Sequence, residues 1–430
     1  MELIGRVTKR LFRPILPKDR TQQQKDKNEM KPSRIGHKTM LLFLLMYLVL
    51  FVQSEAEIIF EDVPEPGFWM EGNSGPWGPG NPFYETQTPL RKRLISYLNS
   101  HPSTIPQLES VFSGHAENIA QDIAALSDAQ MIREIDMREG KAVYAPTFAI
   151  LSRSDLELLG PLMLQAAEAY GEKIDQNRDE LDKILARAGL DTQYRLPVFL
   201  AFIRDKIFYE YMEEKRLFPT EDGLCPKNGK GNLYGVEAYE PLSSRQPYGI
   251  THCMKNEWSY LFVHPYFGSD SLFETWGFKN LWEAKGAFSK IMETVRRKRP
   301  VKESTIVNKF RGKQVEKHIP AILVYLVQQQ ALAESEDGYI NTSARLDKST
   351  MKALKEVSAQ ATAGMAEFIG GVELAQLHEK TSPGRNGISI AEFREAVAWQ
   401  TIWATAGFLR EKGFFPELSE SGRELFVFER

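Results

Sequence analysis

Between residues 90 and 150 the spacing of apolar residues changes, and this change limits the possible folds more than any other property of the chain. Up to residue 128, apolar side chains recur every three to four positions in three short runs, as in amphipathic helices. From residue 131 to 145 they roughly alternate around a turn at Arg138–Lys141, as in a β-hairpin. Thr104 precedes the second run as a candidate N-cap. The pattern predicts three short helices followed by a hairpin.

Three segments of this region carry a family resemblance. They are the second helix TIPQLESVFSG, the third helix HAENIAQDIAALSDAQMI and the hairpin REIDMREGKAVYAP. Together they resemble the winged helix-turn-helix domain of bacterial transcriptional regulators of the ArsR/MarR type. The resemblance implies a fold whose third helix enters the DNA major groove. It rests on apolar spacing without signature residues, so an ordinary helical bundle with one hairpin remains an alternative.

The charge of this region disfavours DNA binding. Residues 115–128, the predicted third helix, contain no Lys or Arg, and we expect Glu117 and Asp122 on its exposed face. Residues 85–158 hold seven basic and ten acidic residues, a net charge of −3. A helix that reads DNA needs hydrogen-bond donors for phosphates and base edges. The fold can therefore be that of a regulator without its function.

A targeting segment precedes this region. Three basic residues between positions 31 and 38 are followed by the unbroken apolar run Met40–Val52 and by the small residues Ser54 and Ala56. The run has 13 residues, within the roughly 7–15 of a signal peptide and short of the ~20 that span a bilayer. We expect export with cleavage after Ala56. An uncleaved signal would leave the body anchored outside, and a buried core helix is the remaining alternative.

Cysteine usage agrees with export. The chain contains two cysteines, Cys225 and Cys253. In an oxidising compartment such a pair predicts a disulfide, which contributes roughly 2–4 kcal/mol. Two unrelated free thiols are the alternative.

A basic stretch stands out in an otherwise acidic body. After residue 56 the chain has 43 basic and 52 acidic residues, a net charge of −9, yet residues 296–317 hold nine basic and two acidic residues. We expect this stretch to contact an anionic envelope polymer, a lipid surface or an acidic partner. A solvated face paired with carboxylates from elsewhere is the alternative. The candidate contact residues are Arg296, Arg297, Lys298, Arg299, Lys302, Lys309, Arg311 and Lys313.

No catalytic, cofactor or metal motif is present in the sequence. His252, Cys253 and His264 are close enough in sequence for a soft metal site, but a disulfide to Cys225 would consume Cys253, and two histidines alone seldom form such a site. Ser349 and Lys352 match S-x-x-K, but we interpret Ser349 as a helix N-cap. The aromatic residues of the middle region fit the core of a small loop-rich region better than a ligand surface. We therefore expect no cofactor, and an envelope hydrolase remains open because carboxylate pairs leave almost no sequence trace.

The end of the chain can be interpreted in two ways. Residues 388–398 and 399–415 match the second and third helices of a second winged-helix-like unit, with a wing at 416–430. A single terminal helix followed by one strand fits equally well. A long helix is also expected at about 349–378, and Ser154 with Glu157 forms a possible capping box.

The whole chain predicts a mainly α fold with small β-hairpins, that is, an α+β protein. The expected regions are an N-terminal extension and signal peptide (1–56), a Pro/Gly/aromatic linker (57–89), a winged-helix domain (90–150), a helical region (151–216), an aromatic loop-rich region (217–290), a helical region with the basic stretch (291–380) and the possible second winged-helix-like unit (381–430).

The function we expect is that of an exported, non-catalytic binding protein of the cell envelope that uses a winged-helix-like module. Its partner would be a protein, an anionic envelope polymer or a lipid surface, and a homodimer is compatible with the sequence. The first alternative is a DNA-binding winged helix-turn-helix regulator. The second is an envelope hydrolase.

Overall fold

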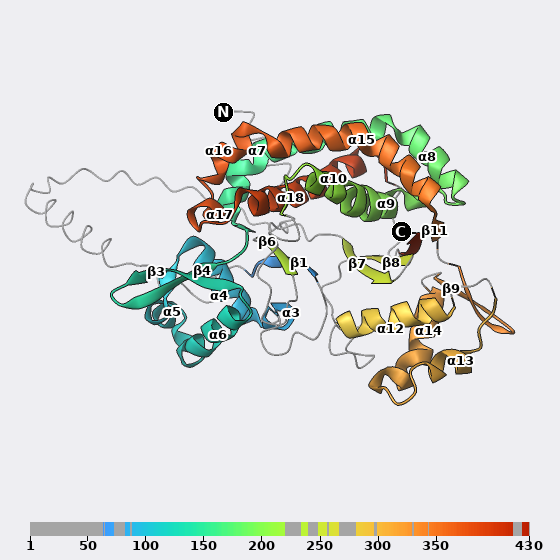
Figure 1. The fold of residues 1–430 in the computed structure, drawn as a ribbon, viewed down its shortest axis with the longest axis horizontal. Coiled ribbons are helices and arrows are strands. Elements are labelled where there is room, and N and C mark those ends of the chain that lie inside the picture. Colours follow the sequence, from blue (N-terminus) through green and yellow to red (C-terminus); the bar gives the residue numbers. More distant parts are fainter. Residues whose placement is uncertain are drawn as a thin grey trace, which may run out of the picture. The chain divides into compact units, whose positions relative to one another are not determined.

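The computed structural model confirms a mainly helical fold with small β-sheets (Figure 1). It describes residues 63, 65–72, 82–86, 88–219, 234–239, 248–255, 258–265, 281–295, 299–328, 331–342, 344–415 and 424–429. The chain divides into two compact units, which are described separately. The first comprises residues 1–67, 79–147 and 240–243, and the second comprises residues 68–78, 148–239 and 244–430.

The first unit begins with a series of short helical elements, one of which, α3 (Pro82–Glu85), lies in the stretch 57–89 that was predicted to be a linker. Its helical elements are α3, α4 (Pro89–Ser100), α5 (Ile105–Val111), the 3-10 helix η2 (Ser113–His115) and α6 (Ala116–Asp128). Thr104 is the N-cap of α5, as predicted, and its backbone N–H donates to Gln107 Oε1 at 2.9 Å. This bond satisfies one of the backbone donors that a helix start leaves without a partner.

The predicted hairpin of the first unit is also present. It consists of β3 (Ile132–Arg138) and β4 (Lys141–Pro146), and β2 (Ser103–Thr104) joins them in an antiparallel sheet of order β2-β4-β3. The turn uses positive φ angles at Glu139 and Gly140, of 53° and 74°. Glycine adopts this backbone conformation at little cost.

Apolar residues at helical spacing form the core of this unit. Leu94, Ile95 and Leu98 of α4 are fully buried, as predicted from their spacing. The corresponding residues of α6 are Ile119, Ile123 and Leu126, and they are at most 2% exposed. Burying each such side chain contributes roughly 1.5–3 kcal/mol. The packing of these stripes, more than helix propensity, therefore holds the short helices in place.

Long helices form the main body of the second unit. They include α7 (Arg153–Gln176), α8 (Arg178–Arg187), α9 (Arg195–Val198), the π-helix η4 (Phe199–Phe208), α10 (Tyr209–Glu214), α15 (Lys348–Gly370), α16 (Val372–His378), α17 (Ser382–Arg385) and α18 (Ile390–Glu411). Figure 1 shows α15 and α18 running alongside α7, and contacts join α7 to both. Gly171 of α7 permits this approach, because a Cβ there would lie 2.5 Å from the Phe408 ring.

The start of α7 differs from the prediction. Ser152, and not Ser154, is the N-cap, and it forms a capping box with Asp155 instead of Glu157. Asp155 is buried, and its second carboxylate oxygen accepts the backbone N–H of Ser382 at 2.9 Å. This long-range bond favours the cap at Ser152, and the spacing of residues near 152–157 could not reveal it.

The predicted helix at 349–378 is two helices. α15 ends before Gly371, whose ψ of 151° is extended, and α16 begins at Val372. The N-cap of α15 is Asp347, not Ser349. The Asp347 carboxylate accepts the Thr350 N–H at 2.7 Å and the Ser349 hydroxyl at 2.8 Å. Hydrogen bonding to the Thr350 backbone lowers the pKa of Asp347, which favours the charged cap.

The second winged-helix-like unit proposed for residues 381–430 is wrong. α18 runs without a break through the position between Ala398 and Trp399 where two helices were expected. Neither proline nor glycine stands there, and both residues are buried. The strand β12 (Glu424–Glu429) pairs with distant strands and does not form a hairpin with its neighbour in sequence. The alternative of one terminal helix followed by one strand is confirmed.

Two small sheets accompany the helices. The first has the order β11-β12-β8-β7 and comprises β7 (Tyr248–Lys255), β8 (Trp258–Pro265), β11 (Ala344–Leu346) and β12. The second has the order β1-β6-β5 and comprises β1 (Gly67–Gly72), β5 (Ile150–Leu151) and β6 (Tyr234–Tyr239).

Residues 281–341 form a segment with its own hydrophobic cluster. Its elements are α12 (Leu281–Thr294), α13 (Glu303–Asn308), the 3-10 helix η5 (Gln314–His318), α14 (Ile319–Gln328), β9 (Leu332–Ser335) and β10 (Gly338–Asn341). α14 starts at Ile319 with Pro320 in its first turn, where a missing N–H is tolerated. Backbone hydrogen bonds of 2.9 Å in both directions join Val301 to Tyr339. This segment carries the basic stretch.

Candidate anionic-surface binding site

Five of the eight predicted contact residues lie around α13. Arg299 and Lys302 precede this helix, and Lys309, Arg311 and Lys313 lie in the turn that joins it to η5. The remaining three, Arg296, Arg297 and Lys298, lie outside the described residues. We refer to Arg299, Lys302, Lys309, Arg311 and Lys313 as the basic cluster.

All five side chains of the basic cluster are exposed. None of them forms an ion pair with a residue that the structure describes. Elsewhere in the second unit, several exposed cations do pair: Arg153 with Glu157, Lys183 and Arg187 with Glu180, Lys352 with Glu356, and Lys355 with Glu214. Within the part of the chain that the structure describes, no carboxylate neutralises the basic cluster through an ion pair.

Both carboxylates of the stretch bond within their own segment. Glu303 Oε2 accepts the Tyr339 hydroxyl at 3.3 Å, and Glu316 Oε2 accepts the Gly312 N–H at 2.7 Å. Burial, together with the nearby Glu303 charge, raises the pKa of Tyr339, so the phenol stays protonated as a donor. The two acidic residues thus stabilise local structure.

The turn that carries three of the cations is anchored by an aromatic residue. Phe310 is 2% exposed within the hydrophobic cluster of this segment. Lys290 Nζ lies 5.3 Å from the centre of its ring, a cation–π contact. Gly312 has a φ of 75°, a left-handed conformation that favours glycine. The sequence thus holds Lys309, Arg311 and Lys313 on a defined turn.

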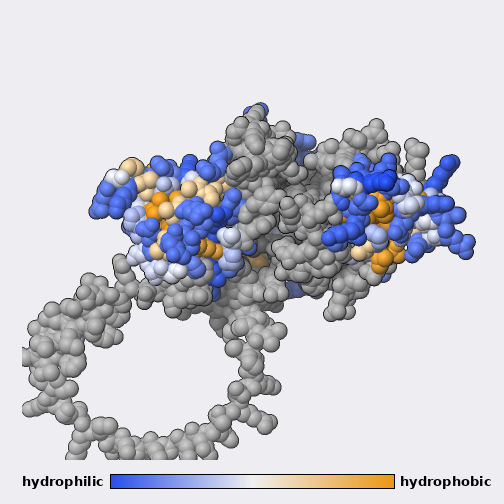
Figure 2. Space-filling view, turned by 90° about the horizontal axis from the view of Figure 1, so that it is seen from below, coloured by the Kyte–Doolittle hydropathy of each residue, from blue (hydrophilic) through white to orange (hydrophobic). Residues whose placement is uncertain are grey.

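The histidine of this segment adds little charge near neutral pH. Burial, and next the positive charge of Lys317, lowers the pKa of His318. Its imidazole is then more fully neutral at pH 7 than that of an ordinary histidine. The positive charge of the segment comes from Lys and Arg side chains, which remain protonated across the physiological range. Figure 2 shows the surface over α12, α13 and α14, on the right, as mostly hydrophilic with a smaller hydrophobic area.

The α6 surface of the first unit has the opposite character. Glu117 is exposed, as predicted, as are Asn118 and Gln121, and no Lys or Arg stands on this helix. The prediction for Asp122 is wrong, because this residue points to α4 and its Oδ1 accepts Arg91 Nε at 2.7 Å. Arg91 also pairs with Glu85. The sequence could not show this pairing, since 31 residues separate Arg91 from Asp122.

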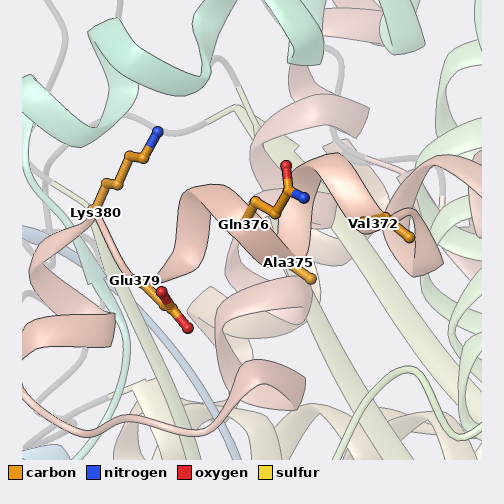
Figure 3. A pocket seen from close by; sticks show the side chains of 5 residues that line it. All are labelled: Val372, Ala375, Gln376, Glu379 and Lys380. Atoms are coloured by element: carbon orange, nitrogen blue, oxygen red, sulfur yellow. The ribbon is translucent and has the colours of Figure 1, made fainter.

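An open hollow of about 490 Å³ lies along α16 and the turn after it. It is lined by Val372, Ala375, Gln376, Glu379 and Lys380. Figure 3 shows the Lys380 amine and the Glu379 carboxylate directed to different sides, so the two charges do not converge on one point. The hollow offers shape but no catalytic arrangement of groups, and the sequence pattern had not indicated it.

The predicted disulfide cannot be placed on the structure. Cys225 lies outside the described residues, and Cys253 stands opposite Tyr260 in the pairing of β7 with β8. His252 pairs with Leu261, whereas His264 pairs with Gly249, three positions along the strand. Among the described residues, no group of three or more His, Cys, Asp or Glu side chains is placed to hold a metal ion.

Comparison with known proteins gives no guide to function, so the basic cluster is the main one. No protein-family model, no curated protein and no solved structure matches the chain. In the part of the chain that the structure describes, no helix combines the length and the apolar character needed to cross a membrane. The apolar run Met40–Val52 lies outside that part.

Proposed function

We propose that the chain is a non-catalytic binding protein of the cell envelope that attaches to anionic surfaces through its basic cluster. The observation that carries this proposal is the set of five exposed cations without a described ion-pair partner. A cation that is already paired gains little from an external anion, whereas an unpaired one contributes about 1 kcal/mol near an anionic membrane. Five such residues within fifteen positions form one electrostatic footprint.

Export is part of the proposal and rests on the basic residues, the apolar run Met40–Val52 and the small residues Ser54 and Ala56. These residues lie outside the described part of the chain. Fractionation followed by N-terminal sequencing should find a mature chain that begins at Glu57. A soluble cytoplasmic chain that retains residues 40–52 would contradict export and favour the DNA-binding regulator.

The winged-helix-like character of the first unit also remains a proposal. The order of helices and strands from α4 to β4 supports it, as does the pairing of β2 with the last strand of the hairpin. The exposed face of α6 supports a use other than DNA recognition, because it offers no cation to phosphate oxygens. We infer a module that contacts a protein or another envelope component, in a monomer or a homodimer.

The test compares two variants with the same change in charge. In the first, the five residues of the basic cluster are replaced by Ala. In the second, five exposed but paired cations are replaced: Arg153, Lys183, Arg187, Lys352 and Lys355. Both variants lose two Arg and three Lys.

We expect the first variant to lose retention on immobilised polyphosphate at about 50 mM salt, where electrostatic binding is strong. The second variant should stay close to the wild type, and circular dichroism should show that both are folded. Equal losses in the two variants would mean that only net charge matters. Unchanged retention in both would contradict the proposed site.

A further inference from the structure

α14 exposes an apolar face in the segment that carries the basic cluster, and it contacts α13. This helix of ten residues, IPAILVYLVQ, contains no charged side chain. Ile322, Leu323 and Leu326 are fully buried in the cluster of the segment. The outward positions Pro320, Ala321 and Val324 are exposed, and 54% of Val324 is accessible to solvent. The described outward positions of the helix are thus apolar, as its core side is.

This face is unusual for a helix at the surface of a protein in water. Such helices normally place polar or charged residues opposite their buried stripe. The described part of the chain exposes five large apolar side chains: Ile135, Met137, Leu158, Val324 and Val372. Val324 is the one that belongs to the segment with the basic stretch: α14 follows η5, whose Lys317 is exposed, and α14 contacts both η5 and α13.

We propose that the face of α14 and the basic cluster together form a docking surface for a bilayer of anionic phospholipid. The inference rests on the proposed function and adds the identity of the anionic surface. A helix of ten residues is about 15 Å long, so it can lie in the interface but cannot span the hydrocarbon. Val324 enters the boundary of the acyl chains while Lys and Arg side chains reach the headgroups.

A bilayer accounts for both features, whereas a soluble polyanion or a second copy of the chain accounts for one. A soluble polyanion neutralises the cations but leaves Pro320, Ala321 and Val324 in water. A second copy of the chain would cover the apolar face, but two such surfaces would bring their positive charges together across the symmetry axis. Charge complementarity therefore favours an anionic lipid surface.

The test measures the full chain on two supports, vesicles of phosphatidylcholine with phosphatidylglycerol, and immobilised polyphosphate. Val324→Ser removes apolar surface without changing the charge. Val372→Ser is the matched control, since this valine is 73% exposed on another helix. We expect Val324→Ser to weaken vesicle binding about fivefold, because the variant lacks the two methyl groups that Val324 would bury in the bilayer. Polyphosphate binding should be the same for both variants, and Val324→Leu should strengthen vesicle binding.

The outcomes separate this inference from the proposed function. If Val324→Ser and Val372→Ser bind vesicles equally while the basic-cluster variant binds neither support, the cluster binds anions but the bilayer inference is wrong. If wild-type protein binds neither support, the proposed function fails as well. If light scattering shows that Val324→Ser lowers the oligomeric state, the face is a contact between copies, and the bilayer inference is again overturned.

Discussion

Arg91 of the first unit and Arg311 of the basic cluster are the same residue type in different surroundings. Arg91 lies between two acidic side chains, with 17% of its side chain exposed, and it joins α4 to α6 and α3. Arg311 stands on a turn, is exposed, and has no described ion-pair partner. The comparison teaches that a count of Lys and Arg does not distinguish structural cations from those available to an external ligand.

The physical difference is one of desolvation and pairing. The attraction between a partly buried arginine and its two carboxylates is strong, because water screens these charges poorly. Removing the arginine leaves both carboxylates without their counter-charge. An exposed cation is solvated and screened, and its removal changes stability little. Its charge remains available to attract an anion over roughly 8–10 Å at physiological salt.

The largest effect we predict comes from removing the arginine of the first unit. Arg91→Ala should lower the opening free energy of α4 and α6 by about 2 kcal/mol, since Asp122 and Glu85 then repel each other without a counter-charge. Hydrogen exchange measured on peptides from residues 88–146 of the full chain should show faster exchange there.

Arg311→Ala is the matched control for this comparison. We expect it to change the opening free energy of residues 299–328, measured by hydrogen exchange, by no more than about 0.5 kcal/mol, as for other exposed surface substitutions. Similar effects of Arg91→Ala and Arg311→Ala would break the distinction between the two regions.

A smaller effect is predicted for DNA. Any retention of duplex DNA at about 50 mM salt should come from the basic cluster and not from α6, because phosphate binding requires cations. Replacing Glu117, Asn118 and Gln121 by Ala should change DNA affinity by less than about twofold, measured by fluorescence anisotropy. Replacing the basic cluster should remove most of the binding.

Loss of DNA affinity in the α6 variant, with its helical circular dichroism intact, would restore the regulator as the better interpretation. The same result would show that the carboxylates of α6 do not prevent the first unit from binding DNA.

Part of the candidate site could be predicted from the local sequence, and part could not. The sequence indicated all five residues of the basic cluster, because charge density is visible without a structure. It did not show that Glu303 and Glu316 bond within the segment, or that Val324 faces solvent. The apolar helix IPAILVYLVQ offers no polar face, so its sequence cannot distinguish the buried side from the exposed one.

What the sequence determined by itself is local. Apolar spacing and cap residues determined the helices and the hairpin of residues 90–146, including the start of α5 at Thr104. Tertiary structure alone decided the cap of α7, where Asp155 meets the backbone of Ser382. It also decided the partners of β12 and the pairing of Arg91 with Asp122. These contacts join residues far apart in the chain, and their energies depend on burial and distance, which spacing along a sequence does not record.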